Sequence, residues 1–301
     1  MKITFFGVRG SYPVPDARMM KYGGRTACVM FTKELNDGAI VPLFIDAGIG
    51  IIEAGKKILP DILAGKCIKR LNIFFTHLHP DHTEGFTFFS PNFLPNVEMN
   101  LYGMSALRKN VGTVFREKMT LPTYPIEYKD LKSKRNHHVI TDGQILYIDS
   151  DGNAKEGAAN SPVYIVEAMQ AFAPSHPQQG AIYYKITDPD TGKSVACIWD
   201  IESRRGGDQR VIAFSKDAEV MIHDTQYTDE EYDSDTTVVQ GFGHSTYSMA
   251  MENAEKAGVK TLMPFHYNPA HTDLVLDEIM NSIKQDKVNV VPSMEGLEVI
   301  V

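Results

Sequence analysis

The chain has 301 residues, of which 43% are hydrophobic, and its formal net charge is −8. This size and composition are typical of a folded enzyme, and we expect residues 1–301 to form a single domain. The acidic balance disfavours a nucleic-acid groove, which needs clustered Lys and Arg, and no apolar run is long enough to span a membrane. The cysteines, Cys28, Cys67 and Cys197, lack the spacing of a disulfide framework or thiolate site, which favours a reducing cytoplasm.

The first half of the chain predicts strands interleaved with two helices. Branched and aromatic residues, punctuated by Gly or Asp, indicate strands at Lys2–Val8, Ala27–Thr32, Pro42–Asp46 and Leu71–Thr76. Apolar periodicity predicts an amphipathic helix over Ile51–Leu63, interrupted by Pro60, and a second helix over Ser105–Lys118. The least regular segments are Leu121–Gly143 and Asp149–Ala159, which we expect to be loops over one face.

The second half predicts another series of strands, followed by two capped helices. The strands are expected at Gln144–Ile148, Val163–Ala173, Ala181–Thr187, Lys193–Trp199, Glu219–Ile222 and Thr261–Pro264. One helix is expected over Tyr247–Ala257, with Ser245 or Thr246 as its N-cap and Gly258 as its stop. Thr272 caps the other helix, Asp273–Lys284, and no repeat or linker divides the chain.

The segment Thr76-His77-Leu78-His79-Pro80-Asp81-His82 carries the strongest indication of function. It places three imidazoles and a carboxylate just after a predicted apolar strand, where Pro80 stops the strand from continuing. Neutral imidazoles and carboxylates are the ligands that hold Zn or a similar divalent ion. The alternative is a polar surface turn that happens to be rich in His.

Polar residues recur where predicted strands end, which disfavours that alternative. Asp46, His77, His176, Asp200 and His266 each follow an apolar segment. A carboxylate or imidazole at such an exit is costly unless it is paired or bound to a metal. One such residue would most often be structural, but five of them on one edge would form a shared site.

These motifs resemble those of the metallo-β-lactamase superfamily, specifically its phosphodiesterase-like branch, which contains the tRNA 3′-processing endonuclease and the PhnP phosphodiesterase. The matching segments span nearly the whole chain: Gly7–Ser11, Tyr22–Thr26, Asp46–Gly48, the HxHxDH turn, Ser175–Pro177, Asp200, Gly243–Thr246 and Phe265–Tyr267. Relatives usually carry Asn in place of Arg25. The resemblance implies an α/β fold, the αββα sandwich of two mixed sheets flanked by helices, with its site at one edge between the sheets.

The resemblance also implies a dinuclear metal site. His77, His79 and His176 would hold the first ion, Asp81, His82 and His266 the second, and Asp200 would bridge them. Zn is the first expectation, although Mn or Fe tolerates the same ligands. Two such ions, about 3.5–4 Å apart, activate a water and stabilise the oxygens of a phosphoryl centre. Asp81 would in addition orient that water, which makes it a candidate catalytic residue.

His244 is the second candidate catalytic residue. It precedes a helix in a glycine-flanked turn, where exposed backbone N–H groups favour an anion. The resemblance implies a phosphate contact, either alone or acting in addition as a proton donor to the leaving group, and the alternative is a structural residue of the helix entry. Asp46 is expected to support the metal turn by hydrogen bonds, and Asp224 to be structural or to support the site.

The other polar candidates receive structural interpretations. They are His223 as a structural residue, His271 as a loop residue, His137 and His138 as solvated residues of a basic run, and Arg9 and Arg25 as either contacts to an anionic substrate or surface ion pairs.

The spacing of the motifs limits the class of substrate that we expect. Asp200 is 24 positions after His176, an interval that two strands and a turn at Asp188–Lys193 use up. The resemblance places a long tRNA-gripping arm in this interval in the endonucleases, so we expect a small anionic phosphodiester, such as a cyclic nucleotide or nucleotide-derived ester, and no structured tRNA. A carboxyl-ester or lactone hydrolase and a non-catalytic metal-binding sensor or scaffold stay open. Dimers are common in such relatives, so a homodimer is one expectation.

Overall fold

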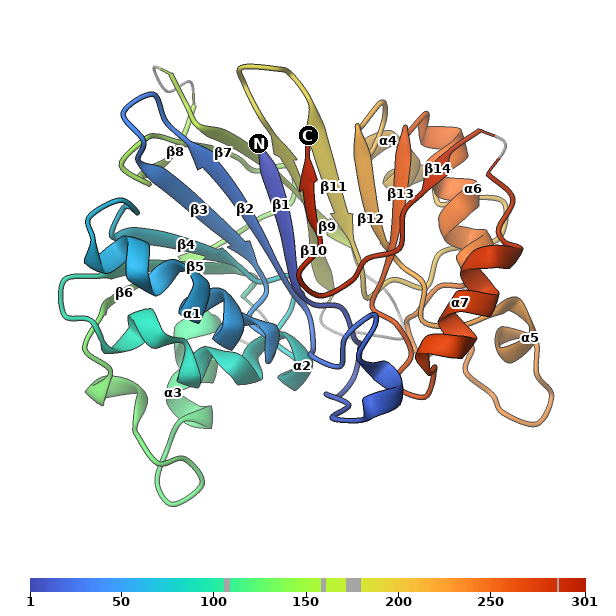
Figure 1. Cartoon of the computed structure of the whole chain (residues 1–301), viewed down its shortest axis with the longest axis horizontal. Helices are drawn as coiled ribbons and strands as arrows, with labels where there is room; N and C mark the ends of the chain where they lie inside the picture. The colour runs from blue at the N-terminus through green and yellow to red at the C-terminus, as the bar shows by residue number, and fades with distance from the viewer. Residues whose placement is uncertain (106–108, 158–160, 172–179, 286) are drawn as a thin grey trace.

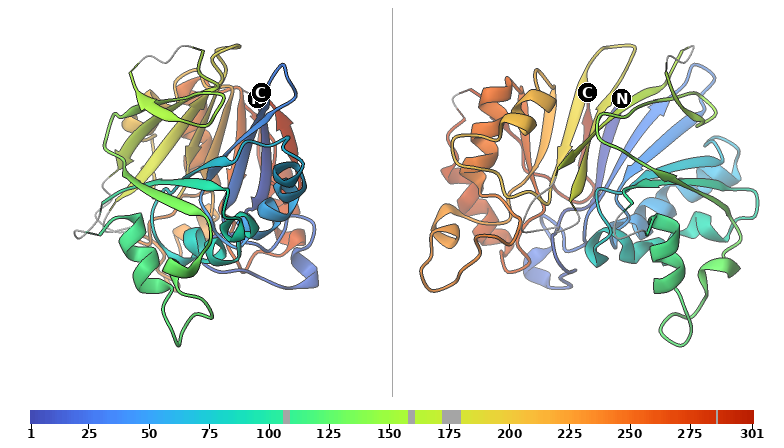
Figure 2. Two further views of the ribbon diagram at one scale, coloured as in Figure 1. Left: turned by 90° about the vertical axis from the view of Figure 1, so that its left-hand side faces the viewer. Right: turned by 180° about the vertical axis from the view of Figure 1, so that it is seen from behind.

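The computed structural model describes residues 1–105, 109–157, 161–171, 180–285 and 287–301 (Figure 1). Two mixed β-sheets lie face to face, and helices cover the outer face of each sheet (Figures 1 and 2). This arrangement confirms the predicted αββα sandwich.

The first sheet has seven strands within the described part of the chain. Their spatial order is β15 (Glu298–Ile300), β1 (Lys2–Gly7), β2 (Cys28–Glu34), β3 (Ile40–Ile45), β4 (Arg70–Phe74), β5 (Glu98–Gly103) and β6 (Lys134–Val139). The pairs from β15 to β3 are antiparallel, whereas β3, β4, β5 and β6 run parallel. The carboxyl ends of these parallel strands therefore lie at one edge of the sheet.

The second sheet has eight strands among the described residues. Their order is β14 (Asn289–Val290), β13 (Thr261–Phe265), β12 (Val220–Asp224), β11 (Ser194–Ile198), β10 (Ala181–Thr187), β9 (Tyr164–Ala171), β7 (Ile145–Ile148) and β8 (Ala154–Glu156). Strands β11 to β14 are parallel, so β11, β12 and β13 also release the chain at a common edge.

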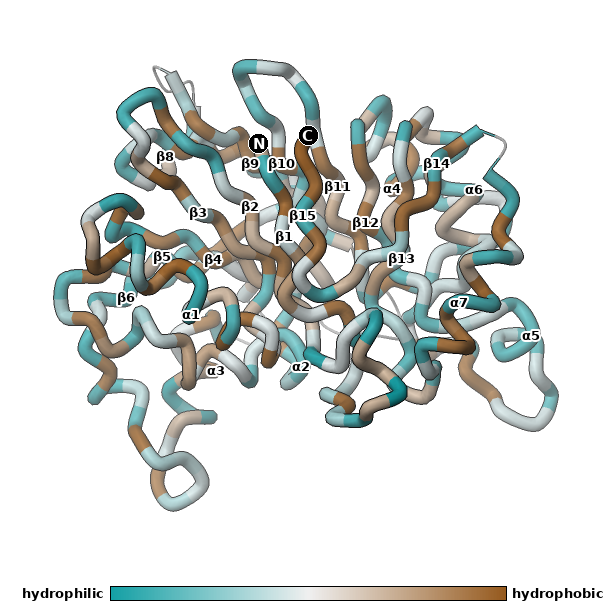
Figure 3. The backbone as a smooth tube through the Cα atoms, in the orientation of Figure 1, coloured by the Kyte–Doolittle hydropathy of each residue, from teal (hydrophilic) through white to brown (hydrophobic). Residues whose placement is uncertain are grey.

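Seven α-helices of the described residues flank the two sheets. They are α1 (Gly50–Leu63), α2 (Pro80–Thr83), α3 (Val111–Lys118), α4 (Gln209–Phe214), α5 (Asp229–Tyr232), α6 (Tyr247–Ala257) and α7 (Asp273–Ser282). Apolar residues of α1 and α3 pack on the outer face of the first sheet, and those of α4 and α6 on the second. A third core, to which Phe5, Phe31, Ile182 and Ile222 belong, fills the space between the sheets. The apolar stretches lie along the strands (Figure 3).

Strands rich in polar residues were missed by the sequence analysis. The segment Leu121–Gly143, expected to be loop, contains β6, and the expected loop Asp149–Ala159 contains β8. Strand β6 reads Lys-Arg-Asn-His-His-Val and lies at the edge of its sheet, where half of its backbone groups face no neighbouring strand. Charged residues are typical of such edges, and an edge strand shows little apolar pattern.

Helix boundaries differ from the prediction in three places. Helix α1 continues through Pro60, because the proline lies in the last turn and removes only one backbone donor there. Helix α3 begins at Val111, capped by Asn110, and not at Ser105; residues 106–108 lie outside the described residues. Helix α7 ends at Ser282. Helix α6 has the predicted bounds, with Thr246 as its N-cap and Gly258 in the left-handed conformation.

The three cysteines are free and buried. Among the residues that the structure describes, no helix is both long and apolar enough to cross a membrane.

Candidate metal centre

Asp46, which directly follows β3, organises the first half of the site. Its backbone has a φ of 61°, which non-glycine residues rarely adopt. Its carboxylate accepts hydrogen bonds from the backbone N–H and hydroxyl of Thr76 (both 2.8 Å), His82 Nδ1 (2.7 Å) and Trp199 Nε1 (2.8 Å). Asp46 therefore holds the HxHxDH turn and joins it to the second sheet, which confirms its expected supporting role.

The HxHxDH turn leaves β4 and enters α2 within a few residues. Pro80 occupies the first turn of α2, where its missing N–H costs no helical hydrogen bond. The turn is closed by the His82 backbone N–H, which donates to the His79 carbonyl (3.1 Å). Asp81 and His82 are buried in α2, and Asp81 Oδ2 accepts from the backbone N–H of Ser11 (2.8 Å). Both side chains are thereby fixed.

The second sheet contributes Asp200 and His266, which follow β11 and β13. Their φ values are 56° and 61°, in the left-handed region that Asp46 and Ser11 (62°) also adopt. The Asp200 backbone N–H donates to Asp224 (2.9 Å), and the Asp200 carbonyl accepts from the Tyr183 hydroxyl (3.2 Å). Such conformations persist only where the surroundings hold them, and they concentrate at functional sites.

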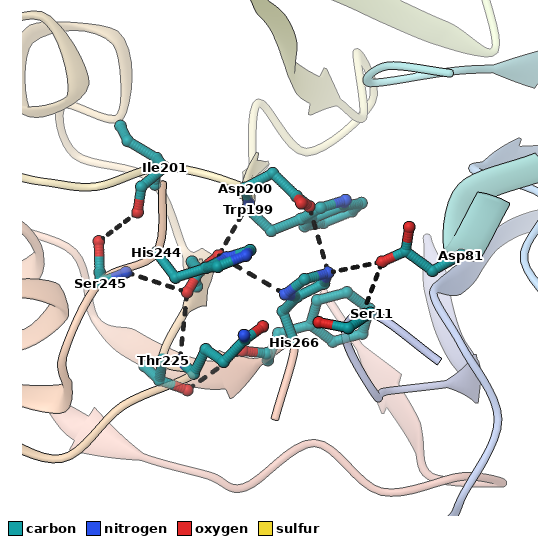
Figure 4. A network of polar contacts seen from close by, with 12 residues as sticks. Ser11, Asp81, Trp199, Asp200, Ile201, Thr225, His244, Ser245 and His266 are labelled. Carbon is teal, nitrogen blue, oxygen red and sulfur yellow. Dashed lines mark hydrogen bonds and ion pairs between the residues drawn. The ribbon is translucent and has the colours of Figure 1, made fainter. Parts of the chain in front are cut away.

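Four of the predicted ligands converge on one point. Asp200 Oδ2 lies 3.2 Å from His82 Nε2 and 3.3 Å from His266 Nε2, and Asp81 Oδ2 lies 3.2 Å and 3.4 Å from the same two nitrogens. Figure 4 shows His266 between the two carboxylates, which come from opposite sheets. One ligand atom from each of these four residues lies within 4.8 Å of the others. This is the spacing of a metal coordination shell.

His77 and His79 lie on the other side of Asp200. His77 Nε2 is 3.6 Å from Asp200 Oδ1 and 2.9 Å from His79 Nδ1. The two oxygens of Asp200 thus face different histidines. The structure brings together six of the seven predicted ligands, and His176, the seventh, lies outside the described residues.

The electrostatics of the cluster favour ionised carboxylates. Burial opposes protonation of His82, but the carboxylates around it outweigh burial and raise its pKa. Burial would raise the pKa of Asp81 and Asp200, but the imidazoles of His82 and His266 outweigh it and hold both pKa values well below their usual range. Burial, aided by the His82 ring, lowers the pKa of His77. The ionised carboxylates and the neutral His77 ring are forms that bind a metal cation, and a cation bound at His82 would displace the proton that the surrounding carboxylates favour there.

Several buried polar atoms at this point fit a metal ion. His82 Nε2, Asp200 Oδ2 and His266 Nε2 are buried, and none has a hydrogen-bond partner among the described residues. Because His82 Nδ1–H donates to Asp46, the neutral form of this ring carries its lone pair on Nε2, which points into the cluster. A buried polar atom without a partner costs about 1–3 kcal/mol. A divalent cation bound by nitrogen and oxygen atoms would satisfy all three.

Asp224, the last residue of β12, organises the second half of the site. It accepts hydrogen bonds from the backbone N–H groups of Asp200 (2.9 Å), Gln226 (3.1 Å) and Ser245 (3.2 Å). His244 Nδ1 lies 2.9 Å from Asp224 Oδ2, and because a carboxylate only accepts, this ring donates from Nδ1. Asp224 therefore fixes the tautomer and orientation of His244.

A pocket of about 460 Å³ opens beside the cluster. It is lined by Asp81, Asp200 and His244, together with Ser11 and Phe242. A substrate in this pocket would meet both the candidate metal ligands Asp81 and Asp200 and the His244 ring.

The two arginines considered for substrate binding have structural partners. Arg9 is buried, and its guanidinium donates to the carbonyls of Gly23 (2.7 Å) and His271 (2.7 Å), so it is neither a surface ion pair nor a substrate contact. Arg25 pairs with Glu295, which agrees with the ion-pair interpretation.

The remaining histidines are held by the fold. His223 is buried, contacts the Asp224 carbonyl (2.8 Å) and lies 3.0 Å from Asn253 Nδ2, so its structural role is confirmed. His271 lies in a loop, and its Nε2 is 2.7 Å from Glu231 Oε1. The expectation that His137 and His138 are solvated is confirmed for His138, which is exposed on β6 and stacks on Tyr102, but it is wrong for His137, which is half-buried and whose Nε2 lies 2.7 Å from the Tyr128 hydroxyl.

Two residues of the site had no role in the sequence analysis. Trp199 donates to Asp46 across the two sheets, and the backbone of Ser11 holds Asp81. The available indication for Trp199 was its position directly before Asp200, a candidate ligand, at the end of a predicted strand. A contact made by a backbone N–H leaves no trace in the residue type.

Comparison with known protein families agrees with this geometry. The model of the beta-lactamase superfamily domain matches residues 43–267. The chain belongs to the β-lactamase superfamily. The match includes the HxHxDH turn, Asp200, His244 and His266, so the expected resemblance and the expected hydrolase class are confirmed.

Individual members of the superfamily resemble the chain over most of its length. Ribonuclease Z of Thermoplasma volcanium is 26% identical over 307 aligned residues, which cover 91% of this chain and 89% of that protein. The fold is similar to human tRNase Z, short form (TM-score 0.56, 19% identity, 100% and 99% of the two chains covered). It is also similar to a diphosphatase from the PhnP family (TM-score 0.61, 18% identity, 100% and 97% covered).

Proposed function

We propose that this chain is a phosphodiester hydrolase that works with two divalent metal ions. The observation that carries the proposal is the position of Asp200, whose Oδ1 faces His77 and whose Oδ2 faces His82 and His266. A carboxylate with histidines on both of its oxygens is suited to bridge two cations. Its positive φ points to a backbone held in place for that purpose.

The ligands divide into two groups around this carboxylate. His77 and His79, with His176, would hold one ion, and Asp81, His82 and His266 would hold the other. Zn suits this donor set best, and Mn or Fe is compatible with it. When bound, two such ions supply Lewis-acid activation of a water and neutralise charge on the oxygens of a phosphoryl group.

The protein groups around the pocket would then position and protonate the substrate. Asp81, fixed by the Ser11 N–H, faces the pocket and would orient the attacking water. His244 lines the same pocket with its Nδ1–H bound to Asp224. In its protonated form it would donate a proton from Nε2 to the departing oxygen, and general acids of this kind typically contribute about 10²–10⁴-fold.

We propose a small phosphodiester, such as a nucleotide-derived ester, as the substrate. From Gly180 to Asp200 the chain forms the β10–β11 hairpin, in which Tyr184 pairs with Cys197 and Thr187 with Ser194. The hairpin is closed by a short turn, which leaves no arm between these strands to grip a large RNA.

Cleavage of RNA is the second candidate, and the similarity to proteins named ribonuclease Z favours it. Hydrolysis of a small phosphodiester and cleavage of RNA both break a phosphorus–oxygen bond at the same centre. The two candidate functions therefore differ in the size of the substrate that the surrounding surface binds. A panel of bis(p-nitrophenyl) phosphate, p-nitrophenyl phosphate, a lactone and a tRNA precursor separates them. We expect turnover of the diester and little cleavage of the precursor.

Asp81→Ala is the control for this panel. It removes one ligand and the group that orients water, so turnover should be lost while circular dichroism shows a folded chain. Activity confined to the lactone would replace the proposal with an ester hydrolase, and metal binding without any turnover would leave a sensor or scaffold.

Metal stoichiometry tests the dinuclear arrangement separately. We expect elemental analysis of protein expressed with ample metal to give about two equivalents of transition metal per chain. One equivalent in the wild type would reject the bridging role of Asp200.

A further inference from the structure

Phe242 stands out among the residues that line the pocket. Its side chain is 56% exposed, although it lies only two residues before His244. The glycines on either side, Gly241 and Gly243, have φ values of 84° and 85°, a conformation that favours glycine. The aromatic ring is thus carried at the tip of a tight turn beside the site.

A single carboxylate holds this turn in place. Glu202 accepts hydrogen bonds from the backbone N–H of Gly241 (2.8 Å) and of Gly243 (3.0 Å), on both sides of Phe242. The Tyr232 hydroxyl donates to the same side chain (2.7 Å). Two hydrogen bonds therefore hold the backbone on both sides of Phe242, and a third, from Tyr232, holds the Glu202 carboxylate that accepts them.

The turn also separates two pockets. The pocket at the candidate metal centre has a volume of about 460 Å³, and a second pocket, lined by Glu202, Arg204 and Tyr232, has about 690 Å³. Gly241 lines both of them. A substrate larger than one phosphate can therefore extend from the candidate metal centre over Phe242.

The residues that line the pocket at the candidate metal centre limit which part of a substrate Phe242 would contact. Among its described lining residues there is no Lys or Arg, so the organic arm of a phosphodiester meets no cation there. An exposed phenyl face gives affinity by stacking, which for a nucleobase on an aromatic side chain amounts to about 1–3 kcal/mol, or about 5- to 150-fold in affinity.

We infer that Phe242 forms a subsite for the base of a nucleotide whose phosphate lies at the candidate metal centre. Glu202 is the positioning residue of this subsite. It accepts hydrogen bonds from the turn that carries Phe242, and it does not line the pocket at the candidate metal centre. The inference rests on the proposed function and sharpens it, since it names the part of the substrate that distinguishes a nucleotide from a simple phosphate ester.

Calorimetric binding to the metal-loaded protein tests the subsite without turnover. AMP and ribose 5-phosphate form a matched pair, because AMP carries adenine at the sugar C1 where ribose 5-phosphate carries a hydroxyl. We expect the wild type to bind AMP about tenfold more tightly than ribose 5-phosphate. Phe242→Ala should abolish that difference while changing the affinity for ribose 5-phosphate less than about twofold, and Phe242→Trp should preserve it.

Two further variants separate positioning from a general loss of structure. Glu202→Gln should reduce the preference for AMP, because an amide cannot accept at both of its atoms. Phe93→Ala is the matched control, since Phe93 is another exposed phenylalanine (44%) that does not line the pocket, and it should bind both ligands as the wild type does.

The outcomes distinguish this inference from the proposed function. Equal binding of AMP and ribose 5-phosphate by a wild type that hydrolyses nitrophenyl diesters rejects the subsite and leaves the proposed function intact. A preference for AMP that survives in Phe242→Ala rejects the role of Phe242. Absence of diester turnover and of binding of both ligands rejects the proposed function, and the subsite with it.

Discussion

Asp46 and Asp224 occupy comparable places in the two sheets, each at the carboxyl end of a strand that leads into the candidate site. Both are fully buried, and each accepts four hydrogen bonds. Their donors differ in kind. Asp46 receives three of its bonds from side chains, including His82 and Trp199, whereas Asp224 receives three from backbone N–H groups and one from His244.

This difference separates two tasks. Asp46 holds a predicted metal ligand, His82, and ties the two sheets together through Trp199, so its charge supports the centre and the fold at once. Asp224 shapes the backbone on which Asp200 and Ser245 lie and presents His244 to the pocket. We therefore expect loss of Asp46 to appear in metal affinity and stability, and loss of Asp224 to appear in proton transfer.

The largest effect is expected from Asp46→Ala. The substitution leaves the buried N–H groups of Thr76, His82 and Trp199 without an acceptor, at a cost of about 3–5 kcal/mol in the free energy of unfolding. Metal affinity should fall about 10- to 100-fold, because His82 loses the carboxylate that orients it. Urea unfolding and competition with a metal chelator measure the two changes.

Asp188→Asn is the matched control for a buried carboxylate far from the centre. Asp188 is buried and pairs with Lys33 (2.6 Å) and with the N-terminal ammonium (3.0 Å). It should lose stability while keeping wild-type metal affinity. Equal losses of metal affinity in both variants would remove the special role of Asp46.

A smaller and more selective effect is expected from His244→Ala and Asp224→Asn. Turnover of a diester with a poor leaving group should fall about 10²–10⁴-fold in His244→Ala, because the departing oxygen then lacks its proton donor. A nitrophenyl ester should suffer much less, since nitrophenolate leaves without a proton. Asp224→Asn should reproduce the same dependence on the leaving group, because the amide no longer fixes the His244 tautomer.

Steady-state rates on the two esters give the comparison directly. An equal loss on both esters would assign His244 to phosphate binding. A loss of metal by Asp224→Asn as large as that of Asp46→Ala would show that the two carboxylates share one task.

The smallest effect is expected from His137. His82 and His244 each form a hydrogen bond with a buried carboxylate, whereas His137 lies beside the Tyr128 hydroxyl. Burial, with the cations of Arg116 and Arg135, lowers its pKa to about 4. Above pH 6.5 the ring is neutral whether the chain is folded or unfolded. Between pH 6.5 and 4 only the unfolded chain binds the proton, so stability falls as the pH is lowered, by about 1 kcal/mol after solvent screening.

His137→Gln should remove this part of the pH dependence while keeping a side chain that can form a hydrogen bond with the Tyr128 hydroxyl. Urea unfolding of both proteins at pH 7 and pH 4.5 gives the difference. A constant stability gap between wild type and variant at the two pH values would contradict the lowered pKa.

Much of the candidate centre was predictable because ligands leave strands at one edge. The apolar segments before Asp46, His77, Asp200 and His266 are continuous enough to read as buried strands. In parallel strands the carboxyl ends meet at the same edge, so residues far apart in sequence were expected together. Helix α6 was also predicted with its bounds, since its cap and its terminal glycine are local features.

Other parts were not predictable, because their cause lies in tertiary contacts. Strand β6 has no apolar pattern and exists because β5 offers it an edge. Arg9 resembles a surface residue in sequence, yet backbone carbonyls from two distant loops surround it. The roles of Ser11 and Glu202 depend on backbone N–H groups, which every residue except proline carries.

The sequence by itself determined the kinds of candidate metal ligand, their order along the chain and the strands that lead to them, because residue type and apolar pattern are local properties. The tertiary structure decided how those ligands are used. It placed one oxygen of Asp200 towards each group of histidines, bound His244 to Asp224 and set Phe242 on a turn clamped by Glu202. Each of these contacts joins segments whose separation in space follows only from packing two sheets against each other.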